Sequence, residues 1–314
     1  MTENDNLALV DHDLSVATVK LSKDLRLAAA EMGPDEARFL ADMFETRQRE
    51  RIRNGNRLIA LEKAGEPIGL ISHFQSIDME MERQLGAALK KFTENQPLGQ
   101  WMVDQKGVGP LIAARLLAFV DWEGSNTPSR IWRFAGLVPN LVWEKGQLRP
   151  WNARLKRVCY LLGESFIKSK GREGAYYGEH FTRKKRELWH KNASGGNKER
   201  ALVLREKVGK TTEAYRWYNG DVTSEAAMMV ARGTWAAGKK PWTTEPGAGL
   251  PMLPPGQIHA QARRWAAKLF LAHAWEVCWR LDPKRMEDPP EPYAIVHLGH
   301  KDIIPAPPGG PYQP

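Results

Sequence analysis

The stretch KGVGPLIAARLLAFV, residues 106–120, decides the fold of this chain. Two glycines flank one aliphatic residue, so the backbone can turn tightly there. Pro110 suits the first position of a helix, where its missing N–H leaves no bond unmade. The pattern predicts a helix-hairpin-helix turn between helices at about residues 98–105 and 110–121.

A turn of this kind presents unbonded backbone amides at a helix start, and such amides bind phosphate. We therefore expect the turn to hold a nucleic-acid backbone without reading bases. The expected contacts are Lys106, Gly107, Val108 and Gly109. The alternative is an ordinary turn between two packed helices, since glycines are common at helix joints.

Positive charge gathers in one region that begins soon after the turn. The chain carries a net charge of +9, yet residues 145–216 hold 19 basic and 7 acidic side chains, a local surplus of 12. Aromatic residues lie between the cations, and rings can stack on bases while cations neutralise phosphates. The expected nucleic-acid contacts here are Arg149, Trp151, Asn152, Arg154, Lys156, Arg157, Lys184 and Lys185. The alternative is a solvated helical face whose rings lie in the core.

The apolar spacing along the chain predicts a mainly α fold centred on the hairpin, with a long N-terminal helical arm. Two long helices are expected at about residues 34–63 and 71–95, followed by a break at Pro97. Three regions follow from this reading: an N-terminal segment 1–96, a hairpin-centred domain 97–281 with an irregular insertion at about 171–256, and a proline-rich tail 282–314 that is extended or disordered.

Several function classes are disfavoured by the sequence. Cys159 and Cys278 are far apart in apolar stretches, so neither a disulfide framework nor a thiolate metal site is expected. The chain shows no signal peptide and no apolar run of membrane-spanning length, which favours a cytoplasmic location and no membrane partner. The run Val208–Thr212 looks like the end of a P-loop, but Leu204 stands where its first glycine belongs. We expect no cofactor and no metal site, and His273 is expected to be a hydrogen-bonded core residue.

Four segments together resemble the C-terminal domain of transposases of the insertion sequence 110 family. They are KGVGPLIAARLLAFVD (106–121), RIWRFAGLVP (130–139), WNARLKRVCYLLGES (151–165) and ARRWAAKLFLAHAWEVCW (262–279). Their order and spacing carry the resemblance, although Trp151 stands where the family has glycine. The resemblance implies a DNA-binding helical domain that takes part in DNA transposition and recombination of a mobile element.

Two departures from that family concern its chemistry. The family's N-terminal RuvC-like nuclease domain, with its quartet of acidic residues, has no counterpart in the fewer than one hundred residues before the hairpin helices. Asp11 and Asp13 are read either as remnants of that domain's first strand or as solvated carboxylates, and two-metal chemistry needs further carboxylates from distant strands. The family's serine after the Gly-Leu-x-Pro block is also missing, because residues 140–146 read NLVWEKG. Since a nucleophilic hydroxyl cannot be replaced by Glu or Lys, no catalytic residue is assigned and enzymatic activity is left open.

The sequence therefore predicts a protein that binds DNA, as a duplex or a junction, through its phosphate backbone. Because the resembled family works with a guide RNA, structured RNA is an alternative partner. Two other readings remain: an active recombinase that uses a partner subunit or an unrecognised nucleophile, and a non-enzymatic helical interaction protein. In the last reading the N-terminal helices pair two copies into a homo-oligomer.

Overall fold

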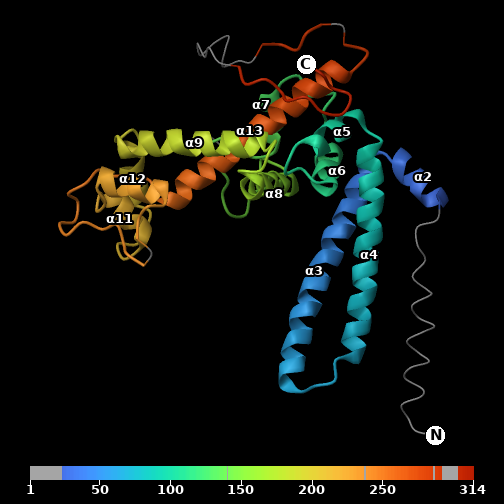
Figure 1. Cartoon of the computed structure of the whole chain (residues 1–314), viewed down its shortest axis with the longest axis horizontal. Coiled ribbons are helices and arrows are strands. Elements are labelled where there is room, and N and C mark those ends of the chain that lie inside the picture. The colour runs from blue at the N-terminus through green and yellow to red at the C-terminus, as the bar shows by residue number, and fades with distance from the viewer. Residues whose placement is uncertain (1–22, 140, 237, 286, 292–302) are drawn as a thin grey trace. The chain divides into compact units, whose positions relative to one another are not determined.

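The chain folds into helices. A computed structural model describes residues 23–139, 141–236, 238–285, 287–291 and 303–314. These described residues form twelve helices and one isolated β-bridge, between Gly309 and Tyr312 (Figure 1). The mainly α fold class predicted from the sequence is confirmed.

The chain divides into two compact units, and each is described by itself. The first comprises residues within 1–131 and 274–314, and the second comprises residues 132–273. Their boundaries fall inside α7 (Pro128–Phe134) and α13 (Pro255–Leu281), so both helices contribute to both units. The turn and the basic segment, which the sequence analysis grouped in one domain, therefore belong to different units.

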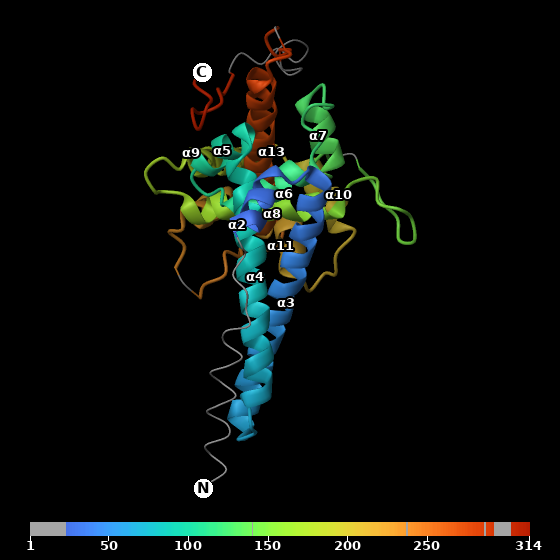
Figure 2. The same ribbon diagram turned by 90° about the vertical axis from the view of Figure 1, so that its right-hand side faces the viewer.

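The first unit begins with α2 (Lys23–Glu31) and the two long helices α3 (Pro34–Ala64) and α4 (Gly69–Glu94), which match their expected bounds within two residues. Pro34 occupies the first turn of α3, and Gly65 ends the helix with a φ of 73°, a conformation that glycine adopts without steric cost. The helices α3 and α4 lie side by side along their lengths in both views (Figures 1 and 2).

Apolar packing between these helices is confined to one end of the pair. Ala41 and Phe44 of α3 lie buried with Leu89 and Phe92 of α4, and Ala114 of α6 (Pro110–Phe119) joins the same core. The turn belongs to the first unit for this reason, because the helix that follows it completes the core of α3 and α4.

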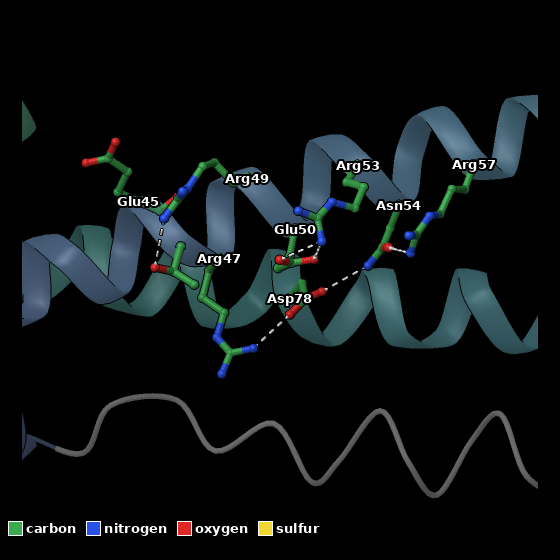
Figure 3. Close-up of polar contacts among 9 residues, drawn as sticks. Glu45, Arg47, Arg49, Glu50, Arg53, Asn54, Arg57 and Asp78 are labelled. Carbon is green, nitrogen blue, oxygen red and sulfur yellow. Dashed lines mark hydrogen bonds and ion pairs between the residues drawn. The ribbon is translucent and has the colours of Figure 1, made fainter. Parts of the chain in front are cut away.

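Farther along, charged side chains join α3 to α4. Arg51 Nε lies 2.6 Å from a carboxylate oxygen of Glu82, and this hydrogen bond raises the pKa of Arg51. Arg47 and Asn54 both donate to Asp78, at 3.2 and 3.3 Å (Figure 3). Half-buried pairs of this kind fix the register of two helices more than they stabilise them.

The second unit is built on α8 (Ala153–Ser169), α9 (Tyr176–Ala193) and the first part of α13. Phe166 stacks on Tyr177 with ring centroids 4.8 Å apart, and Phe270 meets the edge of the same ring at 5.1 Å. The hydroxyl of Tyr177 lies 3.0 Å from Nδ1 of His273. His273 is therefore the buried, hydrogen-bonded histidine that the sequence predicted.

The insertion has a core of its own, which the sequence analysis missed. It contains α10 (Lys198–Arg205), α11 (Glu213–Asn219) and α12 (Ser224–Arg232), where long irregular connections were expected. Trp189 and Trp217 are buried together with Met252 and Leu253 from the proline-rich connection. The expectation was wrong because burial of these side chains orders a segment whose local sequence favours turns.

The described part of the tail, residues 303–314, packs on α5 (Pro97–Asp104) in the first unit. Trp101 Nε1 donates to the carbonyl of Pro307 at 2.8 Å, and the amide of Gly310 donates to Asp104 at 2.6 Å. Tyr312 is buried. Residues 303–314 form no helix, but they are held by hydrogen bonds that the proline-rich composition did not predict.

Gly99 of α5 lies close to α4 and α6, and the contribution of this contact to stability can be tested. A methyl group on Gly99 would lie far inside van der Waals contact of the Thr93 carbonyl oxygen. We expect Gly99→Ala to lower the free energy of unfolding by about 1–3 kcal/mol, because the backbone must shift to admit the methyl group. Urea unfolding measures the change.

Gly69→Ala is the matched control, since Gly69 begins α4 and a methyl group there meets nothing within 4 Å. We expect it to leave stability unchanged or to raise it by up to about 1 kcal/mol. Equal effects of the two substitutions would contradict the packing assigned to Gly99.

Candidate nucleic-acid interface

The twelve residues predicted to contact nucleic acid fall into two groups. Four lie on the turn of the first unit, and eight lie in the second unit. Each group is therefore a surface in its own right. The turn group is Lys106, Gly107, Val108 and Gly109; the second group is Arg149, Trp151, Asn152, Arg154, Lys156, Arg157, Lys184 and Lys185.

The turn joins α5 to α6 as the sequence predicted. Gly107 has a φ of 99°, which requires glycine, whereas Gly109 has a φ of −86° and is the N-cap of α6. Lys106 and Gly109 are exposed, and Gly107 is half-buried. The backbone thus opens to solvent at the start of α6, where the helix dipole is positive.

Val108 has a different role from its neighbours. Its side chain is buried, and its amide donates to the carbonyl of Gln105 at 2.9 Å. Among the described residues no hydrogen bond from the amide of Gly107 or Gly109 is formed, and the N-cap glycine has no side chain that could cap α6. The amides that remain for an anion are those of the two glycines, and Val108 anchors the turn by packing.

In the second unit, Asn152 caps α8. Its side-chain oxygen accepts from the amides of Arg154 and Leu155, at 2.9 and 3.0 Å. The cap engages the side-chain oxygen and gives Asn152 a structural role, while a phosphate would use the donor NH2 group of the same side chain. An asparagine directly before a helical apolar pattern is the signal that indicates this capping.

Trp151 is held between the backbone and a lysine. A methyl group built on Gly136 would lie 2.7 Å from Cγ of the indole, and Gly136 has a φ of 66°. Nζ of Lys156 lies 4.0 Å from the indole centroid. The ring is therefore engaged within the protein, and its evident effect is to position the ammonium group of Lys156.

Five cations are linked through Lys156 and Arg264, and we call them the cation cluster. Burial lowers the pKa of Lys156, and the charges of Arg264 and Arg149 lower it further. Burial likewise lowers the pKa of Arg264, with added repulsion from Arg263 and Arg200. The cluster comprises Arg149, Lys156, Arg200, Arg263 and Arg264, from the loop before α8 and from α8, α10 and α13.

Compensating negative charge is limited at this cluster. Glu164 forms an ion pair with Arg263, whose guanidinium carbon also lies 3.9 Å from the ring centroid of Tyr160. Among the described residues no carboxylate offsets the lowered pKa of Lys156 or Arg264. The cluster therefore produces a positive potential that an external anion can satisfy.

The four remaining predicted cations differ in their surroundings. Arg154 and Arg157 are exposed on α8. Lys184 is paired with Glu187 at 2.8 Å. Lys185 is half-buried, and burial together with the charge of Lys170 lowers its pKa. The two adjacent lysines are thus not equivalent, because only Lys184 has its charge offset.

Sequence reasoning missed Arg200, Arg263 and Arg264 as members of the interface. Their distance in sequence from Lys156 hides the proximity, because α13 returns to α8 only in the folded unit. The signal available was the basic face of the last helix, where Arg263, Arg264 and Lys268 lie opposite an apolar stripe.

Comparisons with protein-family models, with curated proteins and with solved structures gave no match. Within the described residues, no three histidine, cysteine, aspartate or glutamate side chains are grouped so that they could hold a metal ion. Asp11 and Asp13 lie outside those residues. No helix of the described part combines the length and the apolar character needed to cross a membrane.

Proposed function

We propose that this protein binds nucleic acid through phosphate contacts of the cation cluster. The observation that carries the proposal is the grouping of Lys156 with Arg264 and Arg149: burial and then these two positive charges lower the pKa of Lys156, and no carboxylate of the described residues offsets them. Lysine and arginine side chains that are grouped without a carboxylate partner favour binding of a polyanion, since each phosphate that they neutralise also releases counterions. The cluster offers charge and not a pattern that reads bases, so we expect contacts to the phosphate backbone that position the nucleic acid and not base readout.

The turn supplies a second, separate support for this function. The exposed amide of Gly109 stands at the N-terminus of α6, beside the exposed ammonium group of Lys106. Backbone amides at a helix start favour negative charge. Asp104 is a neighbouring carboxylate, but the amide of Gly310 holds it by a hydrogen bond.

The sequence resemblance to insertion-sequence transposases favours DNA, as a duplex or a junction, within transposition or recombination. Structured RNA is the other partner consistent with a phosphate-directed surface. Strand cleavage or joining would need residues from a partner subunit or an unrecognised nucleophile. Nicking of supercoiled plasmid by the purified protein with a divalent metal distinguishes that activity from binding alone.

Binding should depend steeply on salt and on the cation cluster. We expect Arg149→Gln with Lys156→Gln to weaken binding and to reduce the slope of log K against log salt by about 2, one for each lost phosphate contact. Fluorescence anisotropy with duplex, junction, single-stranded DNA and structured RNA measures both quantities and ranks the partners.

Lys207→Gln with Lys210→Gln is the matched control, because it removes the same charge from exposed positions of the same unit outside the cluster. We expect the control to keep the wild-type slope. Wild-type binding that is insensitive to salt, or an equal loss in both double variants, would overturn the assignment to the cluster.

The turn has its own test. Gly109→Asp fits the observed φ of −86° and places a carboxylate at the N-terminus of α6, where it competes with an external anion. We expect nucleic-acid binding to weaken at least about tenfold, the loss of one charged hydrogen bond, while stability is kept. Gly33→Asp is the control, since Gly33 is also an N-cap glycine before a proline with open space around it. Unchanged binding of Gly109→Asp would remove the turn from the interface.

A second candidate function is self-association through the N-terminal helices. Leu70, Phe74, Ile77 and Met81 follow a heptad spacing on α4, and between 38% and 72% of each residue is exposed. A second copy is the occupant we propose, because one stripe can pair with itself about a twofold axis.

Light scattering should give twice the 35.5 kDa chain mass. We expect Phe74→Glu to restore the monomer and Ser76→Glu, beside the stripe, to leave the dimer; a monomeric wild type would exclude this function.

A further inference from the structure

A pocket of about 460 Å³ lies between α9 and α12 in the second unit, and Lys170 at the end of α8 contributes to its wall. We call it the α9–α12 pocket. Its apolar lining includes Phe181 and Trp189, which are buried. Its charged lining is Lys170, Lys185, Arg186 and Arg232, and no aspartate or glutamate lines it.

The sequence of α9 explains how the pocket acquires its character. Phe181, Lys185 and Trp189 recur at intervals of four residues, so they lie along one face of the helix. Arg186 and His190 follow one position later and lie along the edge of that face. A single helix therefore supplies an apolar floor and a row of cations to the same hollow.

These four cations have no internal counter-charge. Among the described residues none of them forms an ion pair, whereas Arg183 and Lys184 on the same helix both pair with Glu187. Burial lowers the pKa of Lys185, and the positive charge of Lys170, which lines the same pocket, lowers it further. A hollow with several unneutralised cations and no acid is suited to a compact anion of more than one charge.

We propose that the α9–α12 pocket binds a phosphomonoester. A terminal phosphate carries close to two charges near neutral pH, while each phosphate within a strand carries one. Arg186 and Arg232 offer planar forks that match phosphate oxygens, and Lys170 and Lys185 add point charges. The volume admits a phosphate with its attached sugar, and a recess takes the end of a strand more readily than a continuous backbone.

Two sources supply this group: the phosphorylated end of a nucleic-acid strand and a free mononucleotide. The strand end is favoured here because the same unit carries the cation cluster, and this part of the inference rests on the proposed function. Recognition of a phosphomonoester by the pocket does not itself require binding along the strand.

The experiment uses the full chain and a short single strand in three forms, with a 5′-phosphate, a 3′-phosphate or hydroxyl groups at both ends. We expect the strand with one of the terminal phosphates to bind about tenfold more tightly than the hydroxyl form, as measured by anisotropy. Arg186→Gln with Arg232→Gln should abolish this preference and keep the affinity for the hydroxyl form. Lys207→Gln with Lys210→Gln should keep the preference.

Calorimetry with AMP forms the second arm and does not depend on strand binding. Binding of AMP that is lost in Arg186→Gln with Arg232→Gln supports the pocket and identifies a free nucleotide as a source. Equal affinity for all three strands together with no AMP binding would overturn the pocket and leave the proposed function intact. Failure to bind any strand, with AMP still bound, would overturn the proposed function and leave the pocket.

If the double variant unfolds at a lower denaturant midpoint than the wild type, Arg186→Gln and Arg232→Gln are measured singly instead. A preference for the terminal phosphate that is kept in both single variants overturns the inference.

Discussion

Repulsion between the clustered cations is the constraint that the other interactions of the second unit must overcome. Lys156 and Arg264 are brought close together by α8 and α13, and each loses part of its hydration there. Such a grouping disfavours the folded state unless another interaction holds it. Aromatic rings provide part of that hold, because Lys156 lies over Trp151 and Arg263 lies over Tyr160. The indole and phenol rings thus order the cations that an anion would meet.

Between α3 and α4 of the first unit, by contrast, charged side chains are paired within the protein. Arg51 is satisfied by Glu82, and Asp78 receives Arg47 and Asn54, so the polar seam between α3 and α4 is closed within the protein. Closed pairs leave little potential for a ligand. The apolar side chains of this helical pair instead face solvent beyond Phe44, which suits contact with another helix and not with a polyanion. The helical pair α3–α4 and the cation cluster therefore favour different kinds of partner, while the turn between α5 and α6 is the part of the first unit proposed to meet phosphate.

Sequence reasoning succeeded where the cause of a structure is local. Gly107, Gly109 and Pro110 fix the turn because a positive φ, an open N-cap and a helix start each depend on one residue. It failed where the cause is distant. Trp189 and Trp217 order the insertion only after they meet, and Arg264 joins Lys156 only after α13 returns to α8. Asn152 has a capping role that was not predicted, since an amide suited to bases is equally suited to capping the next helix.

The uncompensated cations also couple stability to binding. A ligand that neutralises Lys156 and Arg264 removes the repulsion between them in the folded unit. The same ligand gains less by binding the unfolded chain, because there the two charges are far apart and repel each other little. By linkage, any anion with such a preference stabilises the folded state in proportion to its concentration over its dissociation constant. The α9–α12 pocket follows the same rule at smaller scale, because Lys170 and Lys185 oppose each other until a counter-ion enters. Among the described residues, positive charge without a carboxylate partner is thus a cost to the free protein that aromatic rings offset in part and an external anion would offset further, so it supports the proposed binding surface more directly than the net charge does.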